Sequence, residues 1–108
     1  MERVFKALLS LGLSRSEAEI YVYLATEGPR EAANIAENLR LNRQQLSSNL
    51  KSLQKRKIVI STLEHSTQFS ALPFKKTIAL LMKTKRAEAQ NIEQNKEEIL
   101  SEWHSMTR

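Results

Sequence analysis

Four segments in the first half of the chain place apolar residues at the three- and four-residue spacing of a helix that buries one face. The predicted helices cover residues 2–11, 15–27, 32–39 and 43–56. The fourth has the narrowest apolar stripe, which is formed by Leu46, Leu50 and Leu53. Most of its circumference is therefore polar, as expected of a helix that packs on one side and leaves the other side free.

Local signals mark the ends of these helices. Ser14 with Glu17, and Asn42 with Gln45, have the spacing of a capping box, in which each side chain accepts a hydrogen bond from the other residue's backbone N–H. Gly28-Pro29 ends the second helix. The third and fourth helices are joined by a tight turn, which is the arrangement of a helix-turn-helix.

The period changes after the fourth helix. Residues 58–63 and 68–72 are β-prone runs separated by four polar residues, and they predict a hairpin. Pro73 then ends the second strand, and nothing from Phe74 to about Met106 breaks a helix, so one element of roughly 50 Å is expected. The predicted fold is mainly α with a small β-hairpin, in the order of a winged helix-turn-helix followed by a long C-terminal helix.

The long helix carries a heptad-like seam whose members recur at alternating spacings of four and three: Ile78, Met82, Lys85, Ala89, Ile92, Lys96, Ile99, Trp103 and Met106. A domain of about 70 residues cannot cover such a stripe along its whole length. We expect two copies to pair through Ile92, Ile99, Trp103 and Met106. The alternative is that only the first half of the helix packs on its own domain while the rest frays.

The net charge of +5 is concentrated in residues 43–57, which carry five basic side chains and no acidic one. Residues 1–42 sum to −1 and residues 58–108 sum to +1. A basic patch of this kind is the electrostatic feature of a protein that binds a polyanion. A solvated charged face is the ordinary alternative.

Composition excludes several classes of site. The chain has no cysteine, so disulfides and thiolate metal sites are absent, and its two histidines, His65 and His104, lie far apart. No Ser-His-acid set, glycine-rich phosphate loop or paired carboxylates can be assembled, so we expect no enzyme, no metal and no cofactor. No apolar run approaches the ~20 residues that cross a bilayer, and the first residues do not resemble a signal peptide, so we expect a cytoplasmic protein without a membrane partner.

The fourth helix presents the candidate DNA-binding residues: Arg43, Gln44, Gln45, Ser47, Ser48, Lys51 and Lys55. Glutamine suits bidentate reading of adenine, and serine can bond to several base edges, whereas lysine contacts phosphate. The first turn of a recognition helix enters the major groove. An ordinary polar helix surface is the alternative interpretation. Lys75 and Lys76 would extend the phosphate track or simply lie in a solvated helix start.

Several motifs together resemble the N-terminal domain of the TrmB-type regulators of archaea, over roughly residues 8–82. They are Leu11-Gly12-Leu13-Ser14, Glu17-Ala18, Tyr21, Leu24, Gly28-Pro29, Ile35-Ala36-Glu37, Leu50-Lys51-Ser52-Leu53 and Phe69-Ser70-Ala71-Leu72-Pro73. The resemblance implies a winged helix that reads double-stranded DNA as a dimer. The order of the predicted elements divides the chain into a DNA-binding domain over residues 1–73 and a dimerisation helix over residues 74–108. A winged helix that docks proteins inside a larger complex is the competing function.

Three features depart from that family pattern. Larger members carry a C-terminal sugar-binding domain, and this chain ends at Arg108, so we expect no small-molecule effector. The turn before the fourth helix has Arg40 where a glycine is usual, and a left-handed arginine would cost on the order of 1–2 kcal/mol. The predicted wing tip, residues 64–67, has no lysine or arginine, so we expect it to attract DNA weakly.

Overall fold

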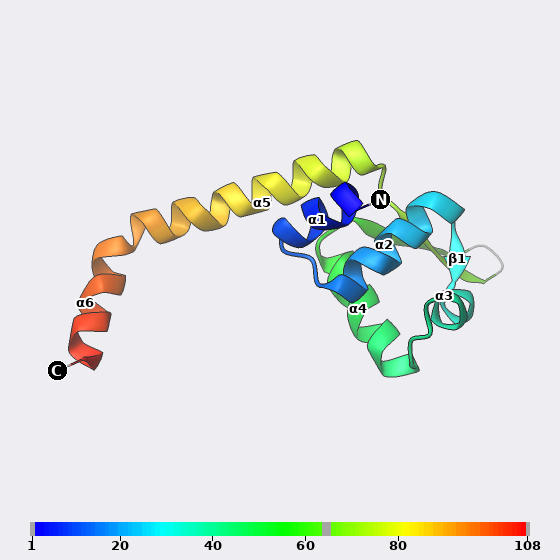
Figure 1. Ribbon diagram of the computed structural model, residues 1–108, viewed down its shortest axis with the longest axis horizontal. Coiled ribbons are helices and arrows are strands. Elements are labelled where there is room, and N and C mark those ends of the chain that lie inside the picture. The colour runs from blue at the N-terminus through cyan, green and yellow to red at the C-terminus, as the bar shows by residue number, and fades with distance from the viewer. Residues whose placement is uncertain (1, 64–65, 108) are drawn as a thin grey trace.

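The computed structural model describes residues 2–63 and 66–107 (Figure 1). Its elements in chain order are α1 (Glu2–Ser10), α2 (Arg15–Glu27), β1 (Arg30–Glu31), α3 (Ala32–Leu39), α4 (Arg43–Lys55), β2 (Val59–Leu63), β3 (Thr67–Ala71), α5 (Phe74–Gln94) and α6 (Lys96–Met106). The four predicted helices of the first half are confirmed to within one or two residues. The described part of the predicted hairpin is confirmed as β2 and β3.

The helix α2 lies at the centre of the folded domain, with α1, α3, α4 and the sheet packed around it. Its side chains Ile20, Tyr21 and Leu24 are buried in the common core. The Tyr21 hydroxyl donates a hydrogen bond to the Leu72 carbonyl at 2.5 Å, which ties the centre of α2 to the segment that follows β3. Phe69 packs against the edge of this core. Both aromatic side chains therefore serve the fold.

Both predicted capping boxes are present. The Glu17 N–H donates to Ser14 Oγ at 3.2 Å and the Ser14 N–H donates to Glu17 Oε1 at 2.8 Å. At the start of α4, the corresponding distances between Gln45 and Asn42 are 2.7 and 3.1 Å. These bonds satisfy backbone donors that have no partner inside a helix, so they fix where α2 and α4 begin.

The sheet has one strand more than predicted. Its order is β1-β3-β2, and both neighbouring pairs are antiparallel. The extra strand β1 contains only Arg30 and Glu31, with Arg30 opposite Phe69. Two residues are too few to show an alternating pattern, and they become a strand only because β3 supplies hydrogen-bonding partners. The expectation for the wing tip rests on Glu64 and His65, which lie outside the described residues.

In the turn between α3 and α4, Arg40 adopts the left-handed backbone conformation whose cost was considered above. Arg40 has φ 55° and ψ 46°, and the Leu41 N–H donates to the Ala36 carbonyl at 3.0 Å, which closes the end of α3. Lys57, just beyond α4, has the same type of backbone with φ 65°. Both positions would favour glycine, so each carries local strain that the tertiary fold maintains.

The prediction of one continuous C-terminal helix is wrong, because the helix breaks at Asn95. This residue has φ −102° and ψ 11°, outside helical values, and its side-chain amide donates to the Asn91 carbonyl at 2.8 Å. The Asn91 carbonyl thus accepts this amide in addition to the Asn95 N–H, which lies 3.2 Å away, and local side-chain bonds of this kind often bend a helix. Figure 1 shows that α6 consequently turns away from the direction of α5.

Only the first turns of α5 are anchored to the domain. Thr77 and Leu81 are buried, whereas every described residue from Met82 onward is exposed. We call the part of α5 after Leu81, together with α6, the arm. The arm projects from the domain and lengthens the molecule to 58 Å (Figure 1). Within the described residues, the structure has no helix that is both long and apolar enough to cross a membrane.

Candidate nucleic-acid interface

The orientation of α4 decides which of its side chains a partner can reach. Leu46, Leu50 and Leu53 are buried, and α4 packs against α2, α3 and β2 through this side. The opposite side remains exposed along the whole helix. The apolar stripe therefore orients α4 as the sequence predicted.

All seven predicted DNA-binding residues are exposed: Arg43, Gln44, Gln45, Ser47, Ser48, Lys51 and Lys55. Five of them line one open hollow of about 490 Å³ on the outer face of α4, namely Arg43, Gln44, Ser47, Ser48 and Lys51. The hollow thus combines two cations with an amide and two hydroxyls. These groups can bond to phosphate oxygens and to base edges, respectively.

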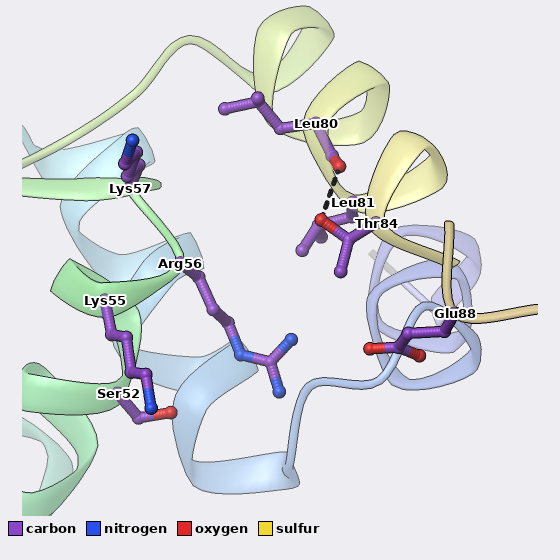
Figure 2. A pocket seen from close by; sticks show the side chains of 8 residues that line it. All are labelled: Ser52, Lys55, Arg56, Lys57, Leu80, Leu81, Thr84 and Glu88. Carbon is purple, nitrogen blue, oxygen red and sulfur yellow. Dashed lines mark hydrogen bonds between the residues drawn. The ribbon is translucent and has the colours of Figure 1, made fainter. Parts of the chain in front are cut away.

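Two of the seven residues, Gln45 and Lys55, do not line this hollow. Gln45 lines an adjoining one together with Gln44 and Ser48. The side-chain oxygen of Gln45 is occupied by the Asn42 N–H, so Gln45 mainly holds the start of α4 in place. Lys55 lies one turn beyond Lys51 and lines a different hollow, next to α5 (Figure 2). Gln45 is therefore a positioning residue first, and Lys55 belongs to the end of α4 that faces the arm.

Arg56 is a basic residue of the same stretch that serves the fold. One of its terminal nitrogens donates to the Gly12 carbonyl at 3.0 Å, and its Nε lies 3.5 Å from the Glu17 carboxylate. Ser52 donates its hydroxyl to the same carboxylate at 2.5 Å. Glu17 thus links the start of α2 to the last turns of α4, and it sets the position of the exposed face.

The pKa of Glu17 lies below its ordinary value. Burial raises this pKa, but hydrogen bonds from Ser52 and from the backbone and hydroxyl of Ser14, together with the charge of Arg56, lower it by more. The carboxyl is therefore ionised at neutral pH. The link between α2 and α4 is a charged one.

The family model described as "Sugar-specific transcriptional regulator TrmB" matches residues 8–75, which is more than half of the chain. The chain belongs to the TrmB family. The resemblance noted from the sequence is thereby confirmed, and the matched segment runs from the buried end of α1, through the helix-turn-helix and the sheet, to the start of α5.

Solved structures share the fold of this TrmB-family chain. The match to the archaeal chromatin protein TrmBL2 spans 99% of this chain and 43% of TrmBL2, with 20% sequence identity and a TM-score of 0.65. The match to a Staphylococcus aureus MepR mutant bound to an oligodeoxyribonucleotide spans 97% of this chain and 85% of that protein, with 14% sequence identity and a TM-score of 0.61. The match to a MarR family transcription regulator spans 97% of this chain and 74% of that protein, with 18% sequence identity and a TM-score of 0.60. No curated protein sequence matches significantly.

These likenesses establish the winged-helix fold. The family is one of transcriptional regulators, the MarR family protein is a transcription regulator and TrmBL2 is a chromatin protein that binds DNA, and none of these is an enzyme, as the sequence predicted. Over residues 2–63 and 66–107, no group of three or more histidine, cysteine, aspartate or glutamate side chains is placed to hold a metal ion.

A second hollow, which the sequence of this TrmB-family chain did not predict, lies beside the first. It measures about 260 Å³ and lies between α4 and β3, where Gln54, Phe69 and Ala32 join Arg43 and Lys51 in its lining. The spacing of Lys51 and Gln54 would have placed both on one side of the helix. The contribution of Phe69 depends on how β3 packs beside α4, which no local pattern reveals.

Proposed function

We propose that this TrmB-family chain is a transcription regulator that recognises specific double-stranded DNA sequences as a homodimer. In this proposal the outer face of α4 enters the major groove. The observation that carries the proposal is the exposed, acid-free surface of α4, which follows the short helix α3 and presents cations beside amide and hydroxyl groups. DNA is also the partner in the MepR structure, and TrmBL2 is a chromatin protein whose structure shows its own mode of DNA binding.

The roles of the side chains follow from their chemistry and position. Gln44 and Ser48 lie on the first turns and read base edges, because neutral donors and acceptors gain most from a matching base. Arg43 and Lys51 flank them and contact phosphates, which supply affinity without sequence information. Lys55 extends the phosphate track toward the arm. Residues 1–73, with the buried first turns of α5 packed on them, form the DNA-binding domain, and the rest of residues 74–108 forms the dimerisation element.

A salt series tests the roles of α4. Lys51→Ala is expected to weaken binding to all duplexes alike and to make the plot of log K against log salt shallower by about one unit. Gln44→Ala is expected to cost about 1–3 kcal/mol on the preferred sequence only. Lys6→Ala is the matched control, because Lys6 is an exposed lysine on α1, which packs on α2. Binding that is equally weak in the Lys6 and Lys51 variants would refute the role of α4.

The homodimer rests on apolar side chains that the single chain leaves in water. On the arm, Ile92 is 60% exposed, Ile99 47%, Trp103 57% and Met106 71%. Burying a side chain of this size contributes ~1.5–3 kcal/mol. No residue of α6 is buried within the chain, so we infer that a second copy covers this surface.

Sedimentation of full-length variants tests the dimer. Ile99→Ser combined with Trp103→Ser is expected to convert a dimer into a monomer, while circular dichroism stays unchanged because both side chains are already exposed. The control is Leu63→Ser, since Leu63 is a 78% exposed apolar residue of β2 and lies off the arm. A wild-type chain that sediments as a monomer at all concentrations would refute the dimer.

A two-fold dimer also predicts the symmetry of the target. Two copies of α4 would contact major grooves about one DNA turn apart, ~34–36 Å, so the preferred site is an inverted repeat. Selection of bound sequences from a random duplex pool checks this. A chain that binds no duplex even at low salt would instead favour a protein-docking role for the winged helix.

A further inference from the structure

A hollow of about 600 Å³ lies between the end of α4 and the base of α5 (Figure 2). Three consecutive cations line its α4 side, Lys55, Arg56 and Lys57, and Leu80 and Leu81 of α5 give it an apolar wall. Pockets for small molecules commonly measure roughly 300–1,000 Å³ and combine an apolar lining with a few polar groups. The hollow therefore has the size and the composition of a small-molecule site.

The Arg56 guanidinium is fixed in this hollow with one nitrogen left over. Its Nη2 donates to the Gly12 carbonyl at 3.0 Å, and its Nε lies 3.5 Å from the buried Glu17 carboxylate. Its Nη1 donates no hydrogen bond to any residue in the ranges 2–63 and 66–107. Figure 2 shows the guanidinium extending from the α4 side into the space that Glu88 borders on the other side. A guanidinium held in this way loses little conformational entropy when Nη1 bonds to an anion.

A further cation lies close to this free nitrogen. A Cβ atom on Gly12 would lie 3.8 Å from Arg56 Nη1 and 3.6 Å from Lys85 Nζ, so both cations approach the same point. The nearest carboxylate to Lys85 is that of the exposed Glu88, at 3.9 Å. Like charges that lie close together repel, and an anion bound between them replaces this repulsion with attraction.

The charge of the lining matches a doubly charged ligand. The three cations and the Glu88 carboxylate leave a net charge of +2, and adding the bordering Lys85 and Glu17 does not change it. A phosphate monoester carries about −1.5 to −2 at pH 7 and offers three strong acceptor oxygens. The hydroxyls of Ser52 and Thr84 already donate within the chain, so the cations are the groups that bind such an anion.

We propose that this hollow binds a small organic phosphate. Arg56 Nη1 is the fixed contact for the phosphate, and the flexible Lys55 and Lys57 close on it from the same side. The organic part lies against Leu80 and Leu81. The expectation of no small-molecule effector concerned a C-terminal sugar-binding domain, whereas this hollow lies between the winged helix and the base of the arm.

The ligand would also affect DNA binding, because the hollow shares Lys55 with the proposed DNA surface. A ligand that engages the Lys55 ammonium removes a contact to DNA phosphate and adds negative charge at the end of α4. The ligand is therefore expected to weaken DNA binding, and DNA to weaken ligand binding by the same factor. This regulation rests on the proposed function, whereas the binding of the ligand does not.

Calorimetric titration of the full chain with phenyl phosphate tests the site. The comparison probes are inorganic phosphate, which lacks the ring, phenol, which lacks the anion, and benzoate, which carries a single charge. We expect phenyl phosphate to bind at least about tenfold more tightly than each of them, because it alone engages both the cations and the apolar wall. No binding of phenyl phosphate, or an affinity equal to that of inorganic phosphate, would overturn the proposal.

Two matched pairs of variants locate the site. Thr84→Glu places a carboxylate in the lining and should weaken phenyl phosphate binding at least about tenfold, whereas the uncharged Thr84→Gln should weaken it far less. Thr84 is exposed, so both variants should fold. Lys57→Gly and Arg40→Gly each remove a cation from a backbone with positive φ, at 65° and 55°, but only Lys57 lines the hollow. Equal losses within both pairs would overturn the proposal.

A mobility shift at constant ionic strength tests the regulation. Saturating phenyl phosphate is expected to raise the Kd for DNA at least about threefold in the wild-type chain and to leave it unchanged in Thr84→Glu, which no longer holds the ligand. Phenyl phosphate that binds without any effect on DNA refutes the regulation and supports the site alone. A chain that binds no duplex refutes the proposed function, while the calorimetric result still decides whether the hollow binds its ligand.

Discussion

Replacing the buried carboxylate of Glu17 is expected to destabilise the domain by loosening α4 from α2. Glu17 is 6% exposed and accepts hydrogen bonds from the Ser14 N–H and the Ser52 hydroxyl, at 2.8 and 2.5 Å. Its second carboxylate oxygen also lies 3.5 Å from the Nε of Arg56. Glu17→Gln keeps the shape and one acceptor oxygen, but it removes the charge and turns an NH₂ toward groups that donate.

The expected loss follows from these contacts. A hydrogen bond to a charged group contributes about 1.5–3 kcal/mol, and Gln retains part of the capping interaction. We therefore expect Glu17→Gln to lower the free energy of unfolding by about 1–2 kcal/mol and Glu17→Ala by about 2–3 kcal/mol. Glu19→Gln is the control, because Glu19 forms an exposed pair with Arg15 on the same helix. The Glu19→Gln substitution should lower the free energy of unfolding by less than about 0.5 kcal/mol.

The pH dependence gives a second check on the same residue. The pKa of Glu17 is lowered in the folded protein, because its hydrogen bonds and Arg56 outweigh the effect of burial. The unfolded chain therefore binds the proton more readily, and the stabilisation is complete above the ordinary pKa of about 4.5. It declines as pH falls below that value and through the folded pKa. The difference between wild type and Glu17→Gln should shrink accordingly.

Urea unfolding followed by circular dichroism, in steps from pH 7 to pH 3, measures both effects. A Glu17→Gln loss no larger than that of Glu19→Gln would refute the structural role of the carboxylate. A difference that stays constant down to pH 3 would refute the lowered pKa. A weaker DNA affinity in Glu17→Gln, at a temperature where the variant is folded, would show that this link positions the exposed face of α4.

Two further substitutions test the backbone and the core. Arg40→Gly should raise the free energy of unfolding by about 0.5–1 kcal/mol, because glycine relieves the left-handed strain but loses more backbone entropy. Lys51→Gly, at an exposed position in the interior of α4, should instead lower it by about 1 kcal/mol. Thermal unfolding compares the two variants, and a destabilised Arg40→Gly contradicts the strain argument. Tyr21→Phe should cost about 1 kcal/mol by removing the bond to the Leu72 carbonyl, and a neutral result in urea unfolding would show that the Thr77 hydroxyl, at 3.3 Å from that carbonyl, satisfies it alone.

The sequence by itself determined the features that depend on near neighbours along the chain. The capping boxes at Ser14 and Asn42 fixed the starts of α2 and α4, because their partners lie only three residues away. The leucine stripe determined which face of α4 turns inward and hence which side chains stay exposed. The left-handed backbone of Arg40 was foreseeable for the same reason, since a tight turn between two helices restricts a single residue. The break at Asn95 was local too, but the bond between its side chain and Asn91 gives only a weak sequence signal.

Only the tertiary structure decided the features that join distant segments. β1 exists because β3 pairs with it, and two residues have no pattern of their own. Glu17 looked like a simple cap, and its second role depends on Ser52, which is 35 residues away in sequence. The hollow between α4 and β3 depends on where β3 lies, and the hollow between the end of α4 and α5 depends on where α5 lies. Contacts of this kind follow from the packing of whole elements, and the energy of packing depends on shape in three dimensions rather than on spacing along the chain.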